Sequence, residues 1–119
     1  MVITEEVCEK VIFRLDDIRA SVQEKGVRAF PAWVFEVESC GSELAAAYKF
    51  GSTGLGYSGK LKEEVPALKH LRQTIIRLSG ACSTAGFGLP PAAVYKVLST
   101  AIEDLEEQIR LLKPAHADG

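Results

Sequence analysis

The fold class of this 119-residue chain depends on residues 31–51, which read PAWVFEVESCGSELAAAYKFG. A helix over 31–50 would begin at Pro31, which suits a first helical turn, and would stop at Gly51. That helix would gather on one face the residues Trp33, Val37, Cys40, Leu44, Ala47 and Tyr48. The alternation in WVFEV favours strands instead, and predicts a β-hairpin over about 32–50. We favour the helix because both of its boundaries are marked and because ELAAA has high helix propensity.

Three further segments have apolar residues three or four positions apart, the spacing of one helix face. With the stretch above, they predict helices at about 5–25, 31–50, 62–79 and 91–113. Gly26 and Gly80 would end the first and third helices, and Pro114 the last. Helices of comparable length are typical of bundles, so we predict an all-α, four-helix bundle-like domain. The alternative is an α+β fold with a β-hairpin at about 32–50 packed on three helices.

The composition is that of an ordinary globular domain, with 47% hydrophobic and 25% charged residues. At this length one core is expected, so we predict a single helical domain over 1–113 and a flexible tail at 114–119. The net charge of −2 argues against nucleic acid as a partner. No apolar run approaches the ~20 residues that span a bilayer, and the acidic N-terminus is unlike a signal peptide. We therefore expect no membrane association and a cytoplasmic location.

Residues that carry chemistry are sparse. Cys8, Cys40 and Cys82 are odd in number and widely spaced, without a CxxC motif, which favours free thiols and gives no support for zinc. His70 and His116 belong to no Glu-x-x-His or His-x-x-x-His pair, and we expect His70 on a solvated helix face. The paired acids have the spacing of solvated helix faces. We predict no catalytic residue, cofactor or metal, and an enzyme is the less favoured interpretation.

Three large aromatic residues, Phe30, Trp33 and Phe35, lie within six positions at the start of the predicted 31–50 helix. Phe35 points away from the Trp33 side, so one buried stripe cannot absorb all three. Exposed apolar surface of this kind often marks an interface, and two-fold dimers are the commonest assemblies. These three residues are therefore our candidate interface for a homo-oligomer, with a dimer expected first.

Two glycine-rich segments, 51–60 and 80–90, are predicted loops that are long for a bundle. The sequence GLGYSG at 54–59 matches GxGxxG, but it lacks the flanking strand and the following acid of a dinucleotide site. A small-molecule pocket at these loops would use Tyr48, Leu55, Tyr57 and Phe87. Candidate contacts for an anion are Ser52, Thr53, Lys60 and Lys62. Up-down connectivity would place the two loops at opposite ends of the bundle, which weighs against a shared pocket.

Charge is uneven along the chain. Residues 57–80 hold five basic and two acidic side chains, whereas 103–107 hold four acids. We expect these charges to face each other between neighbouring helices; an anionic ligand, RNA or an acidic partner is the alternative. The sequence thus predicts a self-associating interaction or regulatory module without catalysis, with another protein as a further candidate partner. The alternative function is a small-molecule binder or minor enzyme that uses loops 51–60 and 80–90.

Overall fold

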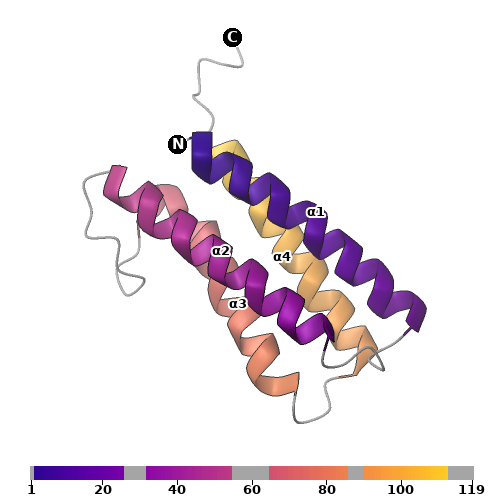
Figure 1. Cartoon of the computed structure of the whole chain (residues 1–119). Helices are drawn as coiled ribbons and strands as arrows, with labels where there is room; N and C mark the ends of the chain where they lie inside the picture. Colours follow the sequence, from indigo (N-terminus) through magenta and orange to yellow (C-terminus); the bar gives the residue numbers. More distant parts are fainter. Residues whose placement is uncertain (1, 26–31, 55–64, 86–89, 113–119) are drawn as a thin grey trace.

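A computed structural model describes residues 2–25, 32–54, 65–85 and 90–112, and all of these except Val65 and Pro90 are helical. The helices are α1 (Val2–Lys25), α2 (Ala32–Gly54), the 3₁₀ turn η2 (Pro66–Leu68), α3 (Lys69–Ala85) and α4 (Pro91–Leu112). They run alternately up and down, and each α-helix packs against two neighbours, with α1 beside both α2 and α4 (Figure 1). The predicted all-α four-helix fold is confirmed. The β-hairpin alternative is wrong, because residues 32–54 form one continuous helix.

The six residues that defined the predicted α2 face are all buried. In strands they would be divided between two opposite faces, whereas helical spacing turns all of them toward the bundle interior. There they meet aliphatic stripes from the other helices, represented by Val11, Leu15, Leu71, Leu78, Leu98 and Leu105. Tertiary packing thus outweighs the strand propensity of WVFEV.

Two of the predicted helix ends are wrong. Gly51 and Gly80 do not stop their helices, since α2 continues to Gly54 and α3 continues to Ala85. A glycine inside a helix costs about 1 kcal/mol relative to alanine. Burial compensates for this cost: Gly51 itself is buried, and Ala81 extends the buried stripe of α3 past Gly80. The other two predicted stops, Gly26 and Pro114, lie outside the described residues.

Prolines mark the start of the third and fourth helical segments. The fourth helix begins at Pro91 as predicted, but the predicted start of the third at about 62 is wrong, because Val65 has an extended backbone immediately before Pro66. Pro66 opens η2, where the Leu68 N–H donates to the Val65 carbonyl at 2.8 Å. Pro91 opens α4, and the Val94 N–H donates to the Pro90 carbonyl at 3.1 Å. A proline at the first helical position loses no hydrogen bond, because its missing N–H would have had no partner in the helix.

One buried polar side chain joins α4 to the beginning of α3. Gln108 is fully buried; its Oε1 accepts a hydrogen bond from the Leu71 N–H at 2.8 Å, and its Nε2 donates to the Ala67 carbonyl at 2.6 Å. The Leu71 N–H lies in the first turn of α3, where backbone donors have no partner within the helix. Gln108 therefore fixes the position of α3 along α4.

Candidate functional site

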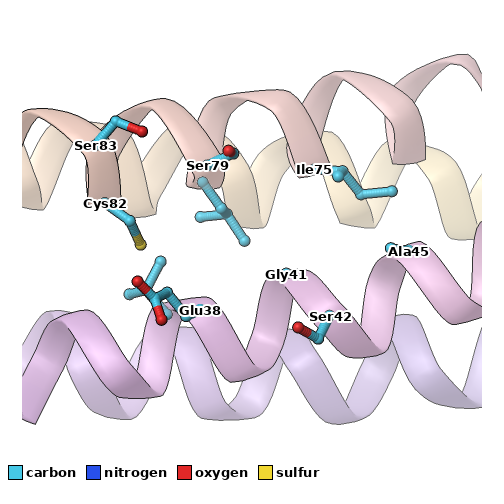
Figure 2. A pocket seen from close by; sticks show the side chains of 10 residues that line it. Glu38, Gly41, Ser42, Ala45, Ile75, Ser79, Cys82 and Ser83 are labelled. Carbon is cyan, nitrogen blue, oxygen red and sulfur yellow. The ribbon is translucent and has the colours of Figure 1, made fainter. Parts of the chain in front are cut away.

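A groove of about 450 Å³ runs between α2 and α3, with α1 and α4 behind it (Figure 2). Its size lies within the range of small-molecule pockets. The floor is apolar, and the rim consists of hydroxyls, one thiol and one carboxylate. The floor is formed by Val37, Ala45, Ile75 and Leu78, and the rim by Glu38, Gly41, Ser42, Ser79, Cys82 and Ser83.

The groove is open because several of the residues that line it have short side chains. Gly41 and Ala45 line it on the α2 side, and Ser79 and Ser83 line it on the α3 side (Figure 2). A Cβ atom placed on Gly41 would have no heavy atom within 4 Å. Such short side chains cannot fill the space between two helices, so the apolar floor remains accessible from outside.

One end of the groove brings a thiol close to a carboxylate. Figure 2 shows the Cys82 sulfur directed across the groove toward Glu38. Burial raises the pKa of the Cys82 thiol to about 11, and the Glu38 charge adds to this effect. The thiol is therefore neutral at pH 7 and a poor nucleophile. Its hydrogen-bond acceptor is the Val34 carbonyl, 3.8 Å from Sγ.

A second unusual surface lies on the outside of α1 and α2. Phe13, Phe35 and Phe50 are 75%, 65% and 56% exposed, and these are all the phenylalanines in the described ranges. Phe13 lies two positions from Val11 and Leu15, and so faces away from the core. Phe35 likewise lies two positions from the buried residues Trp33 and Val37, and so it faces away from the core on α2.

The three rings lie on the same side of the α1/α2 pair. Phe13 follows Lys10 by three positions, and Lys10 pairs with Glu43 at 3.7 Å. Phe50 is seven residues beyond Glu43, or about two helical turns, and so shares its side of α2. Phe35 joins the same stripe, whose members on α2 are Phe35, Ser39, Glu43, Ala46 and Phe50. We call this stripe together with Phe13 the phenylalanine face.

A further hollow of about 510 Å³ lies where the end of α1 meets the start of α4. Its lining residues are Val22, Gln23, Pro91, Ala92 and Tyr95. The Arg19 guanidinium lies 5.6 Å from the centre of the Tyr95 ring and donates to the Ser99 hydroxyl at 3.1 Å. Tyr95 is exposed, and this cation–π contact joins α1 to α4 at the surface.

Of the three predicted interface residues the structure describes two, and these lie on opposite sides of α2. Trp33 is only 4% exposed and belongs to the core, so its inclusion in an exposed aromatic patch is wrong. Phe35 is exposed on the opposite side of α2, as its spacing predicts, and Phe30 lies outside the described residues. Sequence reasoning missed Phe13 and Phe50. The position of Phe13 between Val11 and Leu15 is the signal that could have found it.

The predicted loop pocket is not brought together by the described helices. Tyr48 is fully buried in the core, so it is no pocket-mouth residue. Ser52 and Thr53 belong to the last turn of α2, which corrects their assignment to a loop. The ends of α2 and of α3 lie at opposite ends of the bundle, as up-down connectivity predicts (Figure 1). The remaining candidates, Leu55, Tyr57, Lys60, Lys62 and Phe87, lie outside the described residues.

Charges do meet between α3 and α4, as predicted. Arg77 Nη2 donates to Asp104 Oδ2 at 3.1 Å, and His70 Nδ1 lies 3.9 Å from Asp104 Oδ1. The prediction of a solvated His70 is wrong, because its side chain is half-buried against α4. The side chain of Asp104, from the acidic run, is largely buried and faces both partners, so these charges act in helix packing.

The thiols and the charges define no metal centre in the described part of the chain. Cys8 and Cys40 are free and buried, and burial raises the pKa of both, that of Cys8 to about 12. No group of three or more His, Cys, Asp or Glu side chains within these ranges could hold a metal ion. Among the same residues, no helix is long and apolar enough to cross a membrane.

Comparisons with protein-family models, with curated proteins and with solved structures found no match for this chain.

Proposed function

We propose that this protein is a self-associating interaction module and that two copies meet through the phenylalanine face. The observation that carries the proposal is the exposure of Phe13, Phe35 and Phe50. Phenylalanine is among the residues most often buried, yet the described core is built from aliphatic side chains, two cysteines, Trp33 and Tyr48. Exposed large apolar side chains gathered on one side of a small domain often mark an interface.

The face is complementary to a second copy of itself. Arg14, next to Phe13, reaches Glu36 at 3.6 Å and Glu43 at 3.1 Å, which places Phe13 at the level of α2 between these two acids. That level lies between Phe35 and Phe50, where the exposed residues Ser39 and Ala46 are small.

This register suits a two-fold axis parallel to the helices. Such an axis sets α1 of one copy against α2 of the other. Phe13 of each copy would then pack over Ser39, between Phe35 and Phe50 of the second copy. Each protomer would supply both the protruding ring and the shallow surface that receives it, as an isologous contact requires.

The available area fits a dimer of standard size. A whole phenylalanine side chain has roughly 200 Å² of accessible surface. At the exposed fractions given above, the three side chains together leave roughly 400 Å² in contact with water. A stable interface buries about 800 Å² on each partner. The rings would supply about half of that area and the flanking polar side chains the remainder, which matches the usual apolar centre and polar rim.

Sedimentation equilibrium over a wide range of protein concentration tests the proposal. We expect a dimer of the 12.9 kDa chain, and a dissociation constant raised at least 100-fold by Phe13→Glu. The matched control is Ile76→Glu, which places the same charge on another exposed apolar residue, on α3. A wild-type monomer at all concentrations, or equal effects of the two substitutions, would contradict the proposal.

A further inference from the structure

We propose that the α2/α3 groove is a binding site for a small amphiphilic cation, with an apolar body on the groove floor and an ammonium group beside Glu38. This site is on a different side of α2 from the phenylalanine face, and it does not depend on self-association.

The floor gives the site its affinity for an apolar body. Val37 and Leu78 are almost fully buried, and Ile75 is 8% exposed, so the base of the groove is continuous with the core. From Ile75 to Ser83 the groove follows α3 for about 12 Å, at 1.5 Å per residue. A hollow of this length and volume accommodates an extended alkyl chain or an aromatic ring with a short side arm.

The charge of the ligand follows from the rim. Glu38 is the one charged side chain among the residues that line the groove, and no basic side chain lines it. Within the described ranges Glu38 has no ion pair, whereas its neighbours on α2, Glu36 and Glu43, are paired with bases of α1. An ammonium group would supply the counter-charge that Glu38 lacks, and an anion would be repelled.

The position of Glu38 makes the site directional. Figure 2 shows Glu38 and Cys82 facing each other at one end of the groove, with Ala45 and Ile75 toward the other end. The charged group of a ligand would therefore lie at the Glu38 end, and its apolar body would extend toward Ile75. The neutral Cys82 thiol adds no negative charge at pH 7, so selectivity for a cation rests on Glu38 alone.

Three ligands with the same alkyl chain test the inference: octylamine, octanol and octanoate, each added to the full-length protein at pH 8. Cys82 serves as the reporter, because Cys8 and Cys40 are buried and Cys82 alone of the three is partly exposed. Occupancy is measured as protection of Cys82 from N-ethylmaleimide, followed by mass spectrometry, and independently as a rise in Tm. We expect octylamine to bind about 3- to 10-fold more tightly than octanol, and octanoate to bind least.

Two substitutions separate the contribution of charge from that of shape. Glu38→Gln should remove the preference for octylamine over octanol and leave octanol binding unchanged. Gly41→Phe should block the groove and abolish the Tm rise with all three ligands. The matched control is Gly80→Phe. Gly80 also has open space beside it on a helix, but it does not line the groove. The Gly80→Phe protein should therefore bind the three ligands as the wild-type protein does.

Three results would overturn the inference. The first is equal affinity of the wild-type protein for octylamine and octanol. The second is unchanged binding in the Gly41→Phe protein, which would place the ligand elsewhere. The third is protection of Cys82 only at concentrations where circular dichroism shows loss of helix, which would mean detergent-like unfolding.

Discussion

The two interfaces of α3 are built in opposite ways. Toward α4, long polar side chains close the interface: Gln108 binds the backbone at Ala67 and Leu71, and Asp104 pairs with Arg77. Toward α2, small residues leave a groove above an apolar floor. The comparison teaches that amide and charged contacts fix the register of this bundle on one side. On the other side, apolar packing and the hydrogen bond from Cys82 to the Val34 carbonyl hold the two helices and leave surface available to a ligand.

The largest effect should come from breaking the closed interface at Gln108. Gln108→Met keeps the volume but leaves the Leu71 N–H and the Ala67 carbonyl without their side-chain partner. We expect the free energy of unfolding to fall by about 2–3 kcal/mol. Urea denaturation at fixed protein concentration measures it. Leu105→Met, on the same helix, is the control and should cost less than about 1.5 kcal/mol; equal losses would show that the hydrogen bonds contribute little.

A smaller loss is expected at Asp104. Asp104→Asn removes the charge that Arg77 and His70 face between the helices. Since this carboxylate is largely buried, we expect a loss of about 1 kcal/mol in the same urea assay. Asp16→Asn, which weakens an exposed pair with Arg19 within α1, should cost less than about 0.5 kcal/mol. If the two variants unfold at the same urea concentration, the α3/α4 ion pair is no stronger than a surface pair.

The smallest effect should be a gain on the open side. Gly41→Ala adds a Cβ in open space within α2, and we expect stabilisation by about 0.5–1 kcal/mol from reduced backbone entropy of the unfolded chain. Gly80→Ala is the matched control, because Gly80 also lies inside a helix with open space beside it, and the free energy of unfolding should rise by the same amount. A loss of stability for Gly41→Ala alone would mean that α2 and α3 approach each other more closely in solution than the open groove implies.

Much of the fold could be predicted, whereas much of the candidate site could not. The stripe from Trp33 to Tyr48 in α2 followed from spacing, because residues three or four apart share a helix face wherever the helix packs. The ends of α2 and α3 did not follow, since glycine propensity is a local quantity and burial of Gly51 and Ala81 is a tertiary one.

Of the predicted site residues, Phe35 has the exposure that its position predicted, but Trp33 and Tyr48 are core residues. The face opposite a buried stripe can be read from spacing, which is why Phe35 was identified and why Phe13 could have been. The groove could not be predicted in this way. Gly41 and Ser79 are 38 positions apart, and only the packing of α2 beside α3 brings small residues from the two helices into one hollow.

The sequence by itself determined the helical periodicity, the start of α4 at Pro91, and which side of each helix is apolar, because these depend on residues within one or two turns. The tertiary structure decided the rest. It placed Gln108 on the backbone of η2 and α3, turned Asp104 toward Arg77, opened the groove beside Glu38, and brought Phe13 level with the stretch between Phe35 and Phe50. Each of these depends on which helices are neighbours and in what register, and that is fixed only when the four apolar faces pack against one another.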